Sequence, residues 1–230
     1  MIQLRPSEER GHADHGWLQA RHSFSFGQYH DPRHLGFRSL RVLNEDRIAP
    51  EAGFPPHPHR DMEILTHVLA GRLEHRDSMG HGSVIEAGEF QRMSAGTGVT
   101  HSELNASDSD PVHMLQIWIR PDEAGLTPSY EQGRFDDRRG RFRVVASPDG
   151  REGSLTIRQD AVVASALLDA GASLRHELAP DRHAWLQVVT GDARLDEHEL
   201  SAGDGAAISD VSTLDITTRA GAELLLFDLA

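Results

Sequence analysis

Short runs in which apolar and polar residues alternate recur along the whole chain, bounded by Gly, Pro, Asn or Asp. A two-residue period is typical of strands that bury one face, and the 3.6-residue period of helices is hard to find. The pattern therefore predicts an all-β protein with few short helices. The runs that predict strands or strand pairs are FRSLRVLNEDRI, MEILTHVLAGRLEHRD, SVIEAGEFQRMSAG, VHMLQIWI, FRVVAS, GSLTIRQDAVVASALLD, HAWLQVVTGDARLDE, DGAAISDVSTLDITT and AELLLFDL.

The two halves of the chain carry similar patterns. An apolar run broken by Gly71 in the first half resembles a run broken by Gly191 in the second. Aligning these two glycines also aligns the later turn segments EAGEFQRMSAG and SAGDGAAIS. Two copies of one β-module are the simplest account. The close spacing of the strands favours barrels or sandwiches over strands that alternate with helices.

The boundary between the two copies is expected in the segment 121–140, which lacks a sustained period and contains Pro and Gly. We expect this segment to be a crossover linker with room for one short helix. The predicted domains are therefore residues 1–132 and 133–230.

Composition narrows the class of protein further. The chain has 230 residues, no Cys and a formal net charge of −13. Without thiols, any metal must be held by nitrogen and oxygen ligands. The negative charge disfavours direct binding of nucleic acid, because the field of the protein repels a polyanion. No apolar run approaches the ~20 residues of a membrane-spanning helix and no secretory signal is evident, so we expect a cytoplasmic protein.

Two pairs of residues have types and spacings that suit metal binding. His57 and His59 flank one proline, and His101 and Glu103 follow a glycine-rich turn. Side chains at positions i and i+2 of a strand point to the same face. A lone His-x-His pair is a weak signal, but two strands of one barrel can bring all four side chains around a single ion.

The donor set indicates which metals to expect. Three imidazoles and one carboxylate suit iron, manganese, nickel, copper or zinc, and do not suit calcium or magnesium. Around a six-coordinate ion this set leaves about two positions for substrate, water or dioxygen, which a closed structural site does not need.

Longer motifs around these pairs resemble the cupin superfamily and, more closely, the pirin family of bicupins. Residues 53–71 resemble the first cupin motif, and residues 88–105 resemble the second. The stretches that look like pirins are RHSFSFGQYHDPRHLGF, HPHRDMEILTHVLAGRLEHRDSMGHG, MSAGTGVTHSELNAS and HMLQIWIRP. The resemblance is dense from residue 5 to residue 132 and thin afterwards. It implies two tandem cupin-type β-barrels, the first of which binds metal.

The resemblance also implies a ligand set. Pirins hold their metal by the His-x-His pair and by the His and Glu of His-x-Glu, which correspond to His57, His59, His101 and Glu103 here. General cupins often use the Glu of the first motif, Glu63 in this chain, which shares strand parity with the His pair. We favour Glu103 as the ligand and expect Glu63 to support the strand or the ligands. Iron is the expected ion, with nickel, copper, manganese, cobalt or zinc as alternatives.

The implied function is that of an oxygenase. Some bacterial pirins are similar in activity to quercetin 2,3-dioxygenase, which opens the central ring of a flavonol with dioxygen and releases carbon monoxide. The expected partners are then a flavonol-like aromatic substrate and dioxygen. Glu103 would have two roles, as a metal ligand and as the general base for the substrate hydroxyl.

Two alternatives stay open. The first is a regulatory protein that senses metal or redox state and binds a protein partner, without dedicated catalysis. The second is an enzyme whose natural substrate is not a flavonoid, because cupin folds host many chemistries. A monomer is favoured, since duplicated barrels can cover each other's faces within one chain.

The second half lacks both ligand pairs, so a single metal site is expected. His176 and His183 are interpreted as ordinary polar or partly buried residues. No other histidine, His22 and His75 included, is assigned as a ligand. Core packing is the preferred role of Phe24, Phe26, Phe37 and Trp118, with this N-terminal segment as the nearest candidate for the aromatic lining of a pocket.

Overall fold

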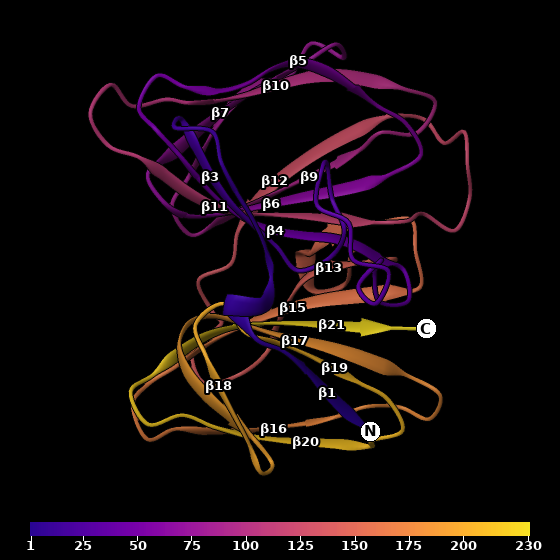
Figure 1. The fold of residues 1–230 in the computed structure, drawn as a ribbon. Helices are drawn as coiled ribbons and strands as arrows, with labels where there is room; N and C mark the ends of the chain where they lie inside the picture. Colours follow the sequence, from indigo (N-terminus) through magenta and orange to yellow (C-terminus); the bar gives the residue numbers. More distant parts are fainter. The chain divides into compact units, whose positions relative to one another are not determined.

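The computed structural model describes all 230 residues, and strands dominate it (Figure 1). The helical content is limited to two 3-10 turns, η1 (Ser7–Glu9) and η2 (Arg151–Gly153). The prediction of an all-β protein is therefore confirmed. No helix of this structure has the length and apolar character needed to cross a membrane.

The chain forms two compact units. The first unit comprises Gly11–Arg134 and Leu155–Gln159, and the second comprises Met1–Arg10, Phe135–Ser154 and Asp160–Ala230. The expected domains, 1–132 and 133–230, differ from these units at the first ten residues, at 133–134 and at 155–159. Strand pairing explains the first difference, because the strand at the N-terminus pairs with a strand near residue 206. Hydrophobic alternation marks a strand without revealing its partner.

The first unit is built from two antiparallel sheets. One has the strand order β12-β9-β6-β11-β4-β3-β2, and the other has the order β5-β10-β7-β8. In Figure 1 the strands β5, β10 and β7 form one layer of this unit, and β6, β11 and β4 form the other. The strands are β2 (Gly11–Asp14), β3 (Leu18–His22), β4 (Leu40–Ile48), β5 (Gly53–His59), β6 (Glu63–Ala70), β7 (Arg72–Asp77), β8 (Gly82–Glu86), β9 (Glu89–Ser94), β10 (Val99–Asn105), β11 (Val112–Ile119), β12 (Ser129–Arg134) and β14 (Leu155–Thr156).

A cluster of fully buried apolar side chains closes one end of the first unit. Leu73 and Ile85 from the smaller sheet pack against Val68 and Met114 from the larger one. Removing such side chains from water is the main driving force that holds two sheets face to face. The remaining space between the sheets carries the polar residues of the candidate site.

The second unit repeats this arrangement. Its larger sheet has the order β1-β19-β17-β21-β15-β13, and on its other layer β16 pairs with β20 while β17 pairs with β18 and β20. The strands are β1 (Ile2–Arg5), β13 (Arg143–Ser147), β15 (Ala161–Leu168), β16 (Ser173–Glu177), β17 (His183–Leu195), β18 (His198–Ser201), β19 (Gly205–Ile208), β20 (Thr213–Thr217) and β21 (Ala222–Leu229).

The predicted duplication is confirmed by the strand orders and by two glycines. The order β9-β6-β11-β4 in the first unit matches β19-β17-β21-β15 in the second. Gly71 and Gly191 both have positive φ, and a side chain at either would collide with a backbone carbonyl, that of Pro111 or of Gly221. Only glycine accepts both the left-handed backbone and the close approach of a neighbouring strand.

The segment 121–140 differs from its prediction. It contains strand β12, which pairs with β9 through partners such as Tyr130 and Met93, and it contains no helix. The expectation of a short helix there is wrong. The segment SYEQGR was overlooked because its side chains are mostly half-buried on a sheet edge, so no apolar alternation marks it.

Candidate metal centre

Strands β5 and β10 bring three predicted ligands together. These strands pair antiparallel, so that His57 lies opposite His101. The ring centroids of His57 and His101 are 4.4 Å apart, and that of His59 lies 4.8 Å from His57 and 4.9 Å from His101. One ligand nitrogen from each of the three rings falls within 4.8 Å of the other two. This is a spacing that a single ion can bridge.

Glu103 joins the cluster through His101. Ligand atoms of Glu103, His101 and His75 also lie within 4.8 Å of one another, so His101 belongs to both groups. The Glu103 side chain is buried, and its carboxylate accepts hydrogen bonds from the Gln116 amide at 2.8 Å and the Thr66 hydroxyl at 3.2 Å. The spacing thus joins Glu103 to His101 and His75 rather than to His57 and His59, while all four residues predicted as ligands line one cavity.

The hydrogen bonds of His101 leave one of its nitrogens for a metal. His101 Nδ1 lies 3.5 Å from His75 Nδ1, and His75 Nε2 lies 3.3 Å from an Asp77 carboxylate oxygen. His101 Nε2 is buried and has no hydrogen-bond partner. A metal-binding histidine commonly donates its other N–H to a neighbour that fixes the ring and the tautomer. The orphaned Nε2 is the observation that fits an ion at this place.

In His57, too, one ring nitrogen makes a hydrogen bond and the other is available for a metal. Its Nδ1 lies 2.8 Å from the carbonyl oxygen of Pro55. With the Nδ1–H donated to that carbonyl, the lone pair is on Nε2 and is available for an ion.

The site favours neutral imidazoles, which are the form that binds metals. Burial, together with the neighbouring His57, lowers the pKa of His59 to about 4. Burial also lowers the pKa of His101 far below its usual range, and the rings of His57, His59 and His75 act in the same direction. Both rings are therefore unprotonated at neutral pH.

Glu63 lies outside the cluster. It begins β6, where the next residue, Ile64, faces the cavity, so Glu63 is on the opposite face of the strand. Its carboxylate accepts a hydrogen bond of 2.7 Å from the Ser94 hydroxyl, and burial raises its pKa. The expected parity with the His pair does not hold, because β5 ends at His59 and a new strand begins at Glu63.

A cavity of about 350 Å³ opens beside the histidines. Phe26 and Trp118 line it, and the Trp118 ring packs edge-on against His59 at 4.9 Å. Core packing, the preferred role of Phe26 and Trp118, is therefore corrected for these two residues, since both line the cavity. The full lining is Leu18, Ala20, His22, Phe26, Asn44, Asp46, Phe54, Pro55, His57, His59, Ile64, His101, Glu103, Gln116 and Trp118.

A row of polar side chains crosses the larger sheet opposite the histidines. Gln91, Thr66, Gln116 and Asn44 occupy directly paired positions on β9, β6, β11 and β4. The Gln91 amide donates to the Thr66 hydroxyl at 3.4 Å. Thr66 and Gln116, the two middle residues of this row, donate hydrogen bonds to the Glu103 carboxylate. Burial raises the pKa of Glu103 to about 7, against the opposing effect of the Thr66 and Gln116 hydrogen bonds.

Sequence reasoning missed several residues of the site, although a signal for them exists. His75 and Asp77 have the same i, i+2 spacing as the ligand pairs. Asn44 and Asp46 have it too, in the middle of strand β4. A polar pair that shares one face of a buried strand indicates a site rather than a core, and this criterion would have found both pairs.

Comparison with known proteins places the chain among well-defined relatives. A model of the Pirin family matches residues 3–119, and a model described as the quercetinase C-terminal cupin domain matches residues 144–229. Quercetin 2,3-dioxygenase of Escherichia coli (strain K12) is 49% identical over 229 residues, covering 100% of this chain and 99% of that protein. A pirin-like protein of Caulobacter vibrioides is 42% identical and covers 100% of both chains.

Solved structures agree with these matches. The crystal structure of the bacterial pirin YhhW from Escherichia coli in complex with nickel(II) superposes with a TM-score of 0.96. That protein is 48% identical, and the match covers 100% of this chain and 99% of the other. The expected architecture of two cupin-type domains is thereby confirmed.

Proposed function

This chain belongs to the pirin family, and on that premise we propose that it is a metal-dependent dioxygenase that cleaves a flavonol such as quercetin. The observation that carries the proposal is the orphaned, buried Nε2 of His101 beside an aromatic-lined cavity. The names of the full-length relatives support the same reaction.

His57, His59, His101 and Glu103 are the residues that would hold the ion. A divalent transition metal bound there supplies Lewis acidity, which lowers the pKa of a coordinated hydroxyl. The donor set suits several such metals, and the nickel complex of the relative supports a divalent ion. Iron and nickel are the two metals to be tested first.

Glu103 is positioned to accept the substrate's hydroxyl proton. Burial raises the pKa of its carboxyl to about 7 in the metal-free protein, and a bound cation would lower it again, so the carboxylate form is present near neutral pH. A general base works best when its pKa lies near the working pH. Gln116 and Thr66 keep the carboxylate oriented while the proton is held at one of its oxygens.

The cavity walls orient the substrate and exclude water. Phe26, Phe54 and Trp118 present aromatic surfaces to the space beside the histidines. Flat aromatic ligands gain from such packing through dispersion and loss of apolar hydration. A low-dielectric wall also strengthens the hydrogen bonds and charge interactions at the reacting end.

The test is turnover of quercetin by protein loaded separately with iron, nickel, copper or manganese under oxygen. We expect loss of flavonol absorbance together with release of carbon monoxide. Glu103→Gln should lower kcat by about 100-fold or more, since a positioned base contributes about 10²–10⁴-fold. Glu63→Gln is the matched control and should retain turnover. Absence of turnover with every metal would contradict the proposal and support the regulatory alternative.

A further inference from the structure

Two polar side chains on the cavity wall have acceptor atoms without partners. Asn44 and Asp46 are only 2% and 4% exposed, and both line the cavity beside the histidines. Oδ1 of each is buried and has no hydrogen-bond partner. An unpaired buried polar atom destabilises the folded protein, so two of them on one wall require an explanation.

These two residues form one polar patch on the wall opposite the histidines. They are two positions apart on β4, so their side chains share a face. Asn44 is paired across the sheet with Gln116, whose amide holds Glu103. A ligand lying in the cavity therefore meets the metal ligands from one sheet and this patch from the other.

We propose that Asn44 and Asp46 bind a hydroxyl of the substrate other than the one at the metal, so that the site selects planar aromatic ligands with at least two hydroxyls. This inference rests on the proposed function and adds the residues that decide which ligands are accepted. Such a hydroxyl donates its proton to the orphaned oxygen of one residue and accepts a hydrogen bond from the other when the Asp46 carboxyl is protonated.

The chemistry of the patch favours a neutral hydroxyl over a carboxylate or a phosphate. Burial raises the pKa of Asp46 to about 8, and the nearby Glu103 and Glu45 carboxylates act in the same direction. A protonated Asp46 both donates and accepts, as a phenol does. An anion bound at the patch would lie beside the Asp46 carboxyl, and the cavity lining contains no Lys or Arg to compensate its charge there, which is costly in a buried site.

The remaining lining fixes the shape of the ligand class. Phe26, Phe54 and Trp118 suit a flat ring system, and the apolar residues between them offer no hydrogen bonds to the many hydroxyls of a sugar. Polar discrimination is strongest where a site leaves its own groups unpaired with the wrong ligand. The patch therefore distinguishes flavonols that differ only in their remote hydroxyls.

The experiment compares two ligands with three proteins under anaerobic conditions. Quercetin and 3-hydroxyflavone share the 3-hydroxyl and 4-oxo groups, but 3-hydroxyflavone lacks the other hydroxyls. Each is titrated, with fluorescence detection, into the metal-loaded wild-type protein, Asp46→Ala and Asp46→Asn. We expect the wild-type protein to prefer quercetin by about tenfold or more, the equivalent of one or two hydrogen bonds.

The variants then test whether Asn44 and Asp46, rather than other residues of the cavity, cause the preference for quercetin. Asp46→Ala should lose most of the preference through weaker quercetin binding, with the affinity for 3-hydroxyflavone changed less than about threefold. Asp46→Asn should keep most of it, because a carboxamide also donates and accepts. Asn44→Ala provides an independent test of the same patch if Asp46→Ala does not fold. Metal content and melting temperature are measured for each variant.

Each outcome has a defined meaning. Equal weakening of both flavonols, or an unchanged preference in the alanine variants, overturns the inference. Binding with the expected preference but without turnover under oxygen overturns the proposed reaction and leaves the inference standing. If the wild-type protein binds neither flavonol, both the flavonol substrate and the inference are overturned.

Discussion

The two units have the same strand order but opposite interiors. In the first unit the paired strands β5 and β10 place His57 opposite His101 beside a cavity. In the second unit the corresponding pair β16 and β20 places Leu174 opposite Ile216 within a continuous apolar core. One β-module therefore accommodates either a metal centre or a packed interior, depending on the residues that alternate along these two strands.

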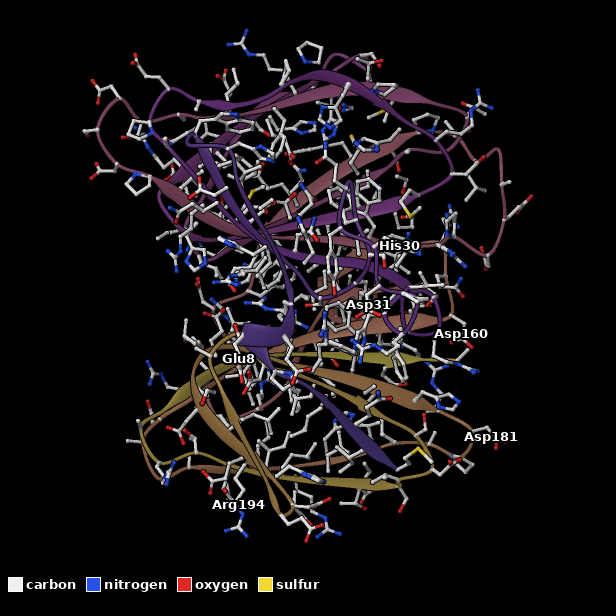
Figure 2. All side chains as sticks on the ribbon, in the orientation of Figure 1. Glu8, His30, Asp31, Asp160, Asp181 and Arg194 are labelled. Atoms are coloured by element: carbon white, nitrogen blue, oxygen red, sulfur yellow. The ribbon has the colours of Figure 1, made fainter.

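The carboxyl groups show the same contrast. The three whose pKa is raised, Asp46, Glu63 and Glu103, are all in the first unit, where burial desolvates them. In the second unit the labelled charged residues Asp181 and Arg194 lie on the outside (Figure 2). The second unit also buries polar residues, Gln187 and Ser165 among them, but it buries no carboxyl group, so buried acids are what distinguish the interior of the first unit.

The largest effect is expected from removing His101, the proposed ligand that belongs to both groups of candidate metal-binding residues. His101→Ala should bind metal more than about 100-fold more weakly, because this residue belongs to both groups of candidate ligands. Loss of a residue that only hydrogen-bonds to a ligand already lowers metal affinity by about 10–100-fold. The measurement is elemental analysis after dialysis of metal-loaded protein. His176→Ala, on β16 of the second unit, is the control and should keep wild-type metal content. Equal metal content in both variants would contradict the assignment.

The stability of the second unit should fall most when a side chain of its apolar core is shortened. Leu214 is fully buried in the apolar cluster, so Leu214→Ala should reduce the free energy of unfolding by about 2–5 kcal/mol. Denaturant unfolding measures this loss, and metal content should stay unchanged. Val84→Ala, at a half-exposed position of the first unit, is the control, with an expected change within about 0.5 kcal/mol. A loss below about 1 kcal/mol for Leu214→Ala would count against the packed core.

The raised pKa of Asp46 predicts that the stability of the folded protein depends on pH through a residue of the first unit. Between the ordinary value of 3.8 and the folded value of about 8, the folded state binds a proton that the unfolded state does not. The metal-free protein should therefore lose stability as the pH rises through this range.

Replacing the carboxyl tests this dependence. The free energy of unfolding should fall less between pH 4 and pH 8 in Asp46→Asn than in the wild-type protein, by roughly 1–3 kcal/mol. Denaturant unfolding at several pH values measures this difference. Asp192→Asn is the control from the second unit. The pKa of Asp192 is lowered by backbone hydrogen bonds from Arg219 and Ala220. Asp192→Asn should therefore not reduce the loss of stability between pH 4 and pH 8. An identical pH profile for wild type and Asp46→Asn would refute the prediction.

The smallest effect is expected on metal affinity when His75, the neighbour of His101, is replaced. His75→Phe keeps the ring but removes the nitrogen beside His101 Nδ1, so metal affinity should fall by about tenfold. Competition with a chelator measures the affinity. His67→Phe replaces a buried ring that stacks on Phe90, away from the cluster, and should leave the affinity unchanged. Unchanged affinity in His75→Phe would show that this contact does not orient His101.

Much of the first unit's site could be predicted because its signals are local. The i, i+2 spacing of His57 with His59 and of His101 with Glu103 follows directly from strand geometry. The turn glycines Gly71 and Gly191 also mark the duplication, since positive φ is a local demand of the backbone.

Other features depended on contacts between distant segments. Glu63 has the same sequence parity as the His pair, yet it faces Ser94 because a new strand begins there. The i, i+2 spacing of Asn44 and Asp46 marks a polar pair, but only the sheet opposite β5 and β10 buries Asp46. The strand β1 joins β19 more than 200 residues away, which no local pattern specifies.

The sequence by itself determined the all-β class, the duplicated module and the residue types that suit a metal, because these depend on periodicity, turn chemistry and donor atoms. Only the tertiary structure decided the partner of each strand, the cavity beside the histidines and the buried state of Asp46. These depend on which surfaces exclude water together, and that is a property of the packed chain rather than of any one segment.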